Sequence, residues 1–158
     1  MVERIGVDPY FLRMAALVSA RSTCARRSVG AVLVSARRHV LATGYNGRPS
    51  GERHCAGLGD AQPCPAASAA SGTHLDGCEA IHAEQNALLQ CRDVYAIATC
   101  YVSVSPCVHC VKLLMNTTCQ RIVFAEPYAH DAAAKELWSR QLMRLTPPRT
   151  REWVELPP

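Results

Sequence analysis

Two short segments carry residues whose types and spacing suit metal chemistry. His82 stands two residues before Glu84, and Cys107 stands three residues before Cys110, directly after Pro106. One histidine and two cysteines supply three ligands for zinc and leave a fourth position open for water. Structural zinc sites use protein ligands at all four positions, so this set predicts a catalytic zinc.

The elements expected around these residues would bring them together. Cys107 and Cys110 fall in the first turn of an expected helix, so their sulfurs face the same way, and His82 opens the preceding helix. The positive ends of two helices would converge on the metal and favour thiolate ligands and a bound hydroxide. Glu84 can take a proton from zinc-bound water and pass it on to a substrate. We expect His109 to face solvent or to pack, not to bind the metal.

The hydrophobic pattern predicts an α/β protein. We expect helices over residues 9–21, 83–91, 107–115 and 131–144, and strands over 30–35, 39–44, 99–104, 121–126 and 151–156. After an opening hairpin, strands alternate with helices, which favours parallel pairing of the later strands. The order predicts a single three-layer α/β/α domain over residues 1–158, with a central sheet of about five strands.

Composition excludes several classes of protein. Hydrophobic residues make up 49% and charged residues 19% of the chain, and no apolar run is long enough for a membrane helix. We therefore expect a soluble, cytoplasmic protein without a membrane partner. The net charge is +4 and aromatic residues are 6% of the chain, which falls short of the dense basic and aromatic face of nucleic-acid binders. This charge suits a small anionic ligand.

The chain has nine cysteines and no convincing secretory signal, which favours metal binding over disulfides. Residues 47–80 are rich in Gly, Pro, Ala and Ser, show no periodicity, and contain several cysteines. A structureless loop of this length in a compact domain needs a reason. We expect Cys91, Cys100 and Cys119, which fall on regular elements, to be small buried hydrophobes.

With these residues placed, the sequence resembles the deoxycytidylate deaminase family over most of its length. The pairing of H-x-E with P-C-x-x-C is common to zinc base deaminases. The turn Gly44-Tyr45-Asn46-Gly47 narrows the resemblance to the branch that acts on nucleotides. The other matching segments are Tyr10-Phe11-Leu12, Arg21-Ser22-Thr23-Cys24, Val29-Gly30-Ala31, Ile81-His82-Ala83-Glu84-Gln85-Asn86-Ala87, Ser105-Pro106-Cys107 and Tyr128.

The resemblance implies a cytidine deaminase-like fold and the deamination of dCMP to dUMP, which supplies thymidylate synthesis. It implies zinc at His82, Cys107 and Cys110, with Glu84 as proton shuttle. Tolerance for 5-methyl or 5-hydroxymethyl dCMP stays open. The other substrate-binding residues that it implies are Asn46 against the deoxyribose, Tyr128 and one of Arg26 or Arg27 at the 5′-phosphate, and Ser105.

The resemblance also implies regulation and assembly. Family members are typically homo-hexamers activated by dCTP and inhibited by dTTP. The turn Gly44, Tyr45, Asn46 and Gly47 would contribute to the effector site, since turns of this kind offer backbone N–H groups to phosphates.

A second zinc is implied at a structural site. Some family members hold a zinc at positions that match Cys24, Cys55, His74 and Cys78, and Cys64 could substitute for one of them. Without metal, residues 47–80 have too little apolar surface to offset their ordering entropy. The alternative is a disordered insert with stray cysteines.

Two other functions stay open. A deaminase acting on a base within tRNA or single-stranded nucleic acid would need a groove with basic and aromatic residues. A zinc-binding module without catalytic activity would not need Glu84. The low aromatic content and the turn Gly44-Tyr45-Asn46-Gly47 disfavour the first, and the intact Glu84 disfavours the second.

Overall fold

The computed structural model describes residues 3–57, 59–70, 72–140 and 151–158. In chain order its elements are α1 (Val7–Ser19), β1 (Gly30–Ser35), β2 (Val40–Tyr45), the single-turn helix η1 (Leu75–Gly77), α2 (Ala83–Gln90), the single-turn helix η2 (Val94–Ala96), β3 (Ile97–Val104), α3 (Val108–Met115), β4 (Arg121–Glu126), α4 (Ala132–Trp138) and β5 (Glu152–Glu155). The strands form one sheet in the order β2-β1-β3-β4-β5. β1 pairs antiparallel with β2 and β3, whereas β3, β4 and β5 run parallel, as predicted.

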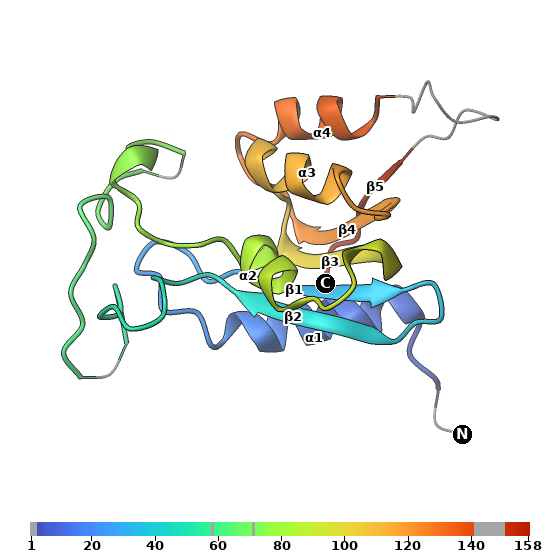
Figure 1. Ribbon diagram of the computed structural model, residues 1–158, viewed down its shortest axis with the longest axis horizontal. Helices are drawn as coiled ribbons and strands as arrows, with labels where there is room; N and C mark the ends of the chain where they lie inside the picture. The colour runs from blue at the N-terminus through green and yellow to red at the C-terminus, as the bar shows by residue number, and fades with distance from the viewer. Residues whose placement is uncertain (1–2, 58, 71, 141–150) are drawn as a thin grey trace.

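Helices cover both faces of this sheet (Figure 1). Successive side chains of a strand point to opposite faces. Val32 and Val34 of β1 therefore pack in the cluster that contains α1. Ala31 and Leu33 pack in the other cluster, with α2, α3 and α4. The predicted three-layer α/β/α architecture with a five-stranded sheet is confirmed.

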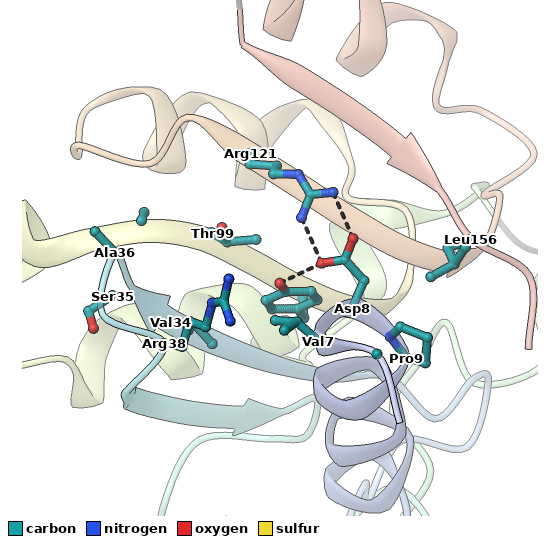
Figure 2. A pocket seen from close by; sticks show the side chains of 13 residues that line it. Val7, Asp8, Pro9, Val34, Ser35, Ala36, Arg38, Thr99, Arg121 and Leu156 are labelled. Carbon is teal, nitrogen blue, oxygen red and sulfur yellow. Dashed lines mark hydrogen bonds and ion pairs between the residues drawn. The ribbon is translucent and has the colours of Figure 1, made fainter. Parts of the chain in front are cut away.

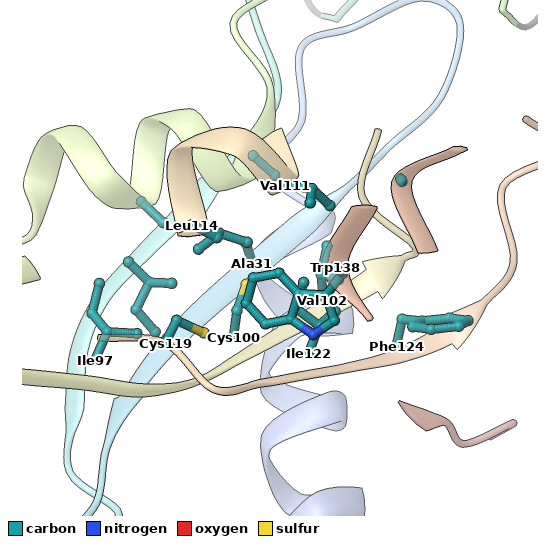
Figure 3. Packing of buried hydrophobic residues seen from close by; sticks show 14 of the residues in the cluster. Ala31, Ile97, Cys100, Val102, Val111, Leu114, Cys119, Ile122, Phe124 and Trp138 are labelled. Carbon is teal, nitrogen blue, oxygen red and sulfur yellow. The ribbon is translucent and has the colours of Figure 1, made fainter. Parts of the chain in front are cut away.

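The larger core is built around Trp138 of α4 (Figure 3). The indole Nε1 of Trp138 donates a hydrogen bond to the Glu152 carbonyl at 2.8 Å, which ties α4 to β5. Cys100 and Cys119 are fully buried in this core, as expected. Cys91 is only half-buried and packs against its edge.

Element bounds differ from the predicted ones at a few positions. α1 begins at Val7, because Pro9 lies in the first turn, where helical N–H groups lack intrahelical partners and a missing one is tolerated. α4 ends at Trp138, and residues 141–144 of the predicted helix lie outside the described part of the chain. None of the described helices is long and apolar enough to cross a membrane.

The end of β2 lies very close to α2, and this contact places the start of α2 beside the sheet. A Cβ at Gly44 would lie 2.3 Å from both the Ala83 carbonyl oxygen and the Ala87 nitrogen. Only glycine leaves room for that approach. Beyond β2, the described part of the segment up to residue 80 contains η1 as its one helical turn, and it extends away from the sheet on the side of α2 (Figure 1).

An ion-pair network ties the start of α1 to the sheet (Figure 2). Asp8 accepts hydrogen bonds from two nitrogens of Arg121, at 2.7 and 2.8 Å, and from the Tyr101 hydroxyl at 2.8 Å. Arg121 Nε also donates to Glu152 at 2.8 Å. The hydrogen bonds from Arg121 hold the pKa of the Asp8 carboxyl below its ordinary value. These groups line a cavity of about 690 Å³.

Candidate metal centre and its cavity

The three predicted ligands of the catalytic zinc converge at the starts of two helices. His82 is the N-cap of α2 and Cys107 is the N-cap of α3. His82 Nδ1 lies 3.5 Å from Cys107 Sγ and 3.4 Å from Cys110 Sγ. The three ligand atoms lie within 4.8 Å of one another, and no other such group occurs among the residues that the structure describes.

Local hydrogen bonds fix both helix starts. The His82 N–H donates to Gln85 Oε1 at 2.8 Å, which caps α2. β3 ends at Val104, and the Ser105 N–H donates to the Glu126 carbonyl at 2.8 Å, which continues the parallel pairing with β4 up to the motif. The ligands are thereby held by the sheet through both helix starts.

The ligand spacing fits zinc. Tetrahedral geometry with Zn–S near 2.3 Å and Zn–N near 2.0–2.1 Å separates sulfur and nitrogen ligands by roughly 3.5 Å. The separations of 3.5 and 3.4 Å between His82 Nδ1 and the two sulfurs match that value. Two cysteines and one histidine are also a donor set that zinc prefers over hard cations.

Hydrogen bonds join the two thiols and the imidazole, and a bound zinc ion would take the place of the protons in these bonds. A hydrogen bond from Cys110, with a second from His82, lowers the pKa of Cys107 to about 3. The same bond to Cys107, together with burial, raises the pKa of Cys110. The hydrogen bond to Cys107 raises the pKa of His82. A cation bound here would displace these protons, since zinc takes thiolate and neutral imidazole.

Glu84 lies in the first turn of α2 and is 3% exposed. Burial raises the pKa of its carboxyl, and the groups that act on it electrostatically include His82, Cys107 and Cys110. A carboxyl with a raised pKa can both accept and release a proton near neutral pH. The position and environment of Glu84 therefore suit a proton shuttle.

A cavity of about 760 Å³ opens beside these residues, a size typical of small-molecule sites. Its walls come from five parts of the chain: the metal centre, residues 24–29, Asn46, the described part of residues 67–80, and Tyr128 with His130. The structure thus brings the catalytic motif and the predicted substrate-binding residues Arg26, Arg27, Asn46, Ser105 and Tyr128 to one cavity.

Asn46 is buried and its side chain is largely engaged within the protein. Its Oδ1 accepts from the Ser22 hydroxyl at 2.7 Å and from the Val29 N–H at 2.8 Å. Its Nδ2 donates to the Arg27 carbonyl at 2.7 Å, so one amide hydrogen stays available for a ligand. Asn46 therefore holds residues 22–29 against the end of β2.

The other residues of the predicted effector turn are also engaged. The Asn46 N–H donates to the Val29 carbonyl and the Gly47 N–H to the Ile81 carbonyl. Gly44 packs on α2, as described above. The Tyr45 side chain is exposed and is the part of the turn that a ligand could reach.

Ser105 is buried, and its hydroxyl joins the motif to the turn after β4. It donates to Asp131 Oδ2 at 2.7 Å and accepts from the Tyr128 N–H at 2.6 Å. Both bonds are internal to the protein. No pattern in the sequence indicated the contact between Ser105 and Asp131, which lie 26 residues apart in the chain.

Arg26 and Arg27 line the cavity from the segment before β1. Arg26 Nη2 donates to the Ala70 carbonyl at 2.6 Å, and Arg27 lies 3.8 Å from Glu126 in an exposed pair. His109 is exposed at the cavity edge, in keeping with its expected role.

The cysteines of residues 47–80 are only partly gathered. Cys55 and Cys64 are buried in one small cluster, and Cys78 packs against it. Cys24 lies near Cys55. His74 is exposed, and its ring lies against Gly77. The structure therefore does not bring the predicted set of Cys24, Cys55, His74 and Cys78 to mutual ligand distance.

Comparison with known proteins agrees with this geometry. A model of the cytidine and deoxycytidylate deaminase zinc-binding region matches residues 6–126. Deoxycytidylate deaminase of Schizosaccharomyces pombe is 38% identical over 148 residues, covering 89% of this chain and 44% of the relative. Deoxycytidylate deaminase of Mycobacterium phage D29 is 41% identical over 122 residues, covering 74% of this chain and 92% of the relative. The chain thus spans less than half the length of the yeast protein.

Solved structures share the fold. The dCMP deaminase from cyanophage S-TIM5, in complex with dCMP and dUMP, superposes with a TM-score of 0.64 at 24% identity, over 86% of this chain and 93% of that one. From the match over residues 6–126, which includes the histidine and both cysteines of the metal centre, the chain belongs to the cytidine and deoxycytidylate deaminase family.

Proposed function

We propose that the chain catalyses the zinc-dependent hydrolysis of dCMP to dUMP and ammonia, supplying dUMP for thymidylate synthesis. The observation that carries the proposal is the convergence of His82, Cys107 and Cys110 beside the buried Glu84, at the end of a nucleotide-sized cavity. The relative from Mycobacterium phage D29 supports the choice of substrate, because this chain matches it over 92% of its length.

His82, Cys107 and Cys110 would hold the metal. Bound zinc lowers the pKa of its water and so supplies a nucleophile at neutral pH. The Glu84 carboxylate would accept a proton from the water as its oxygen attacks C4 of the pyrimidine. It then delivers the proton to N3 of the pyrimidine and assists the departure of the amine at C4. Burial of Glu84 favours this role, because its raised pKa makes the protonated form accessible.

The remaining cavity residues would orient the nucleotide. The unused amide hydrogen of Asn46 is available to the deoxyribose. Tyr128 and one of Arg26 or Arg27 would bind the 5′-phosphate, which is favoured by the guanidinium fork. Ser105 would act by holding the Tyr128 turn in place, since its hydroxyl is engaged in internal bonds.

A substrate panel tests this proposal. The zinc-loaded chain is incubated separately with dCMP, CMP, deoxycytidine, dCTP, 5-methyl dCMP and 5-hydroxymethyl dCMP, and with tRNA and single-stranded DNA, and ammonia release is measured. We expect dCMP to have the highest kcat/KM of the unsubstituted compounds. Turnover confined to a base within tRNA or DNA would instead support a polynucleotide deaminase, and ammonia from none of the compounds would support a binding module.

We also propose a second, structural zinc in the cysteine-rich segment, held by Cys24, Cys55 and Cys78 with Cys64 or His74 as fourth ligand. The contact of Cys64 with Cys55 and the exposure of His74 favour Cys64. Metal analysis of the wild type and four variants tests this. Two zinc ions per wild-type chain, falling to one in Cys78→Ser and Cys64→Ser but not in His74→Ala or the control Cys91→Ser, would support the site. One zinc in the wild type would contradict it.

The family resemblance is the basis for a proposal about regulation by nucleotides. We propose a homo-hexamer with a sigmoidal response to dCMP, activated by dCTP and inhibited by dTTP through the turn that includes Gly44, Asn46 and Gly47. The exposed Tyr45 side chain supports a contact there. Coupling of this kind is typically about 1–3 kcal/mol. Saturation curves with and without each effector, together with light scattering, test both points. A hyperbolic curve indifferent to both nucleotides would contradict the regulatory role.

A further inference from the structure

The cavity beside the metal centre is also lined by a histidine that belongs to neither catalytic motif. His130 lines the cavity, and its ring meets the Tyr128 ring edge to face, with centroids 5.6 Å apart. Tyr128 is a residue expected at the 5′-phosphate. The His130 imidazole therefore lies beside a side chain that we expect to bind the 5′-phosphate.

The long segment before α2 also reaches this point. Gly72 has φ +80°, and a Cβ placed on it would lie 2.3 Å from His130 Cδ2, 2.7 Å from His130 Nε2 and 2.9 Å from the Tyr128 hydroxyl. Two residues earlier, the Ala70 carbonyl accepts the hydrogen bond from Arg26. Arg26 thus contacts Ala70, and Tyr128 and His130 lie next to Gly72, although these side chains come from distant parts of the sequence.

Hydrogen bonds to Ser105 hold the turn that carries His130. The Ser105 hydroxyl binds both the Tyr128 N–H and the Asp131 carboxylate, on either side of His130. The Asp131 N–H also donates to the Tyr128 carbonyl at 3.1 Å. The backbone of this turn is therefore anchored to the residue that precedes Pro106, and the exposed His130 side chain projects from it.

We propose that His130 donates a hydrogen bond from its imidazole to the 5′-phosphate of the substrate, between Arg26 and Tyr128, and so favours nucleotides over nucleosides. The inference rests on the proposed deamination of dCMP. We place the pyrimidine at the metal centre and the 5′-phosphate at the part of the cavity wall where a guanidinium, a phenol and an imidazole offer N–H and O–H donors. Asp131 carries the nearest acidic side chain in this turn, and its bond to Ser105 occupies it.

Kinetics with matched ligands test the role of His130. The KM for dCMP is measured together with the inhibition constants of dUMP and deoxyuridine, which differ only in the phosphate. His130→Ala should raise the KM for dCMP and the inhibition constant of dUMP by roughly ten- to a hundredfold, the range for a hydrogen bond to a charged group. Inhibition by deoxyuridine should change less than about twofold. His130→Gln keeps an N–H donor and should recover part of the loss. His39→Ala, in the exposed β1–β2 turn, is the control.

A pair of glycine variants tests the backbone contact separately. Gly72→Ala would push a methyl group into the His130 ring and should raise the KM for dCMP. Gly51→Ala is the matched control, because Gly51 has a similar φ of +91° with no atom within 4 Å of an added Cβ. It carries the same backbone strain without the collision.

The outcomes separate the inference from the proposed function. A wild-type chain that does not deaminate dCMP contradicts the proposed function. If the wild type is active, two results would overturn the role of His130: an unchanged KM in His130→Ala, or equal weakening of dUMP and deoxyuridine.

Discussion

Two cavities of similar size lie at opposite ends of the sheet, about 690 Å³ at the start of α1 and about 760 Å³ at the metal centre. In the first, Arg121 and Tyr101 both donate hydrogen bonds to the Asp8 carboxylate (Figure 2). In the second, His82, Cys107 and Cys110 converge on a point between them, and Glu84 is buried next to it. The polar groups of the first cavity form hydrogen bonds with one another's side chains. Those of the second are arranged to bind a metal ion.

This difference shows that cavity volume does not identify a functional site. Buried polar groups are normally paired, and a pair such as Asp8 with Arg121 already meets that requirement. Thiols that share protons with an imidazole can exchange them for a metal ion. Substitutions in the two cavities should therefore affect different properties, activity in one and stability in the other.

The largest effect is expected for Cys107→Ser. Loss of one thiolate leaves two protein ligands for the catalytic zinc, so both the bound zinc and the turnover of dCMP should be lost. Metal analysis and ammonia release measured on the same sample check this. Cys119→Ser, in the core and away from the cavity, is the matched control and should keep both. Full turnover in Cys107→Ser would disprove the assigned ligand set.

Glu84→Gln should separate binding from catalysis. The amide cannot accept or deliver the proton, so kcat should fall by about two to four orders of magnitude. Zinc content should stay near the wild-type value, because Glu84 is not needed as a ligand. A kcat within a few fold of wild type would contradict the shuttle, as would loss of the metal.

Asp131→Ala should have a smaller effect on activity. It removes the acceptor for the Ser105 hydroxyl and loosens the turn that holds Tyr128. We expect kcat/KM for dCMP to fall about tenfold, the equivalent of about 1.4 kcal/mol. Asp131→Asn keeps an acceptor oxygen and should retain most of the activity. Equal losses in the two variants would argue against a role for this bond.

Asp8→Asn, in the other cavity, should lower stability and leave kcat/KM for dCMP unchanged. Loss of the carboxylate charge and of one of the two bonds to Arg121 should reduce the free energy of unfolding by about 1–2 kcal/mol at pH 7. The pKa of Asp8 is lowered in the folded state, so its contribution is present above the unfolded value of 3.8. The difference between wild type and variant in urea unfolding should therefore shrink as the pH falls below about 4. A difference that grows in acid would contradict this account.

The sequence predicted the metal centre better than the rest of its cavity. The ligands lie beside strand and helix boundaries, which hydrophobic periodicity locates, and β1 and β4 were placed correctly at 30–35 and 121–126. The contacts of Gly72 with His130 and of Ala70 with Arg26 depend on the path of an irregular segment. Such a path follows from tertiary packing, which no local pattern records.

The Ser105 contacts show the same limit. The motif marks Ser105 as a residue near the substrate, but its hydroxyl bonds to Asp131, 26 residues later. That pairing depends on the parallel alignment of β3 and β4, which places the ends of both strands together. Sequence spacing alone does not give this register.

The most direct test of the central claim is the conversion of dCMP by one preparation whose zinc content is varied. The purified chain is assayed for dUMP and ammonia as isolated, after removal of zinc with a chelator, and after zinc is restored. We predict dUMP and ammonia in equal amounts, loss of both on chelation, and recovery on adding zinc. A folded, zinc-loaded chain that forms no dUMP, or turnover unaffected by complete removal of zinc, would contradict it.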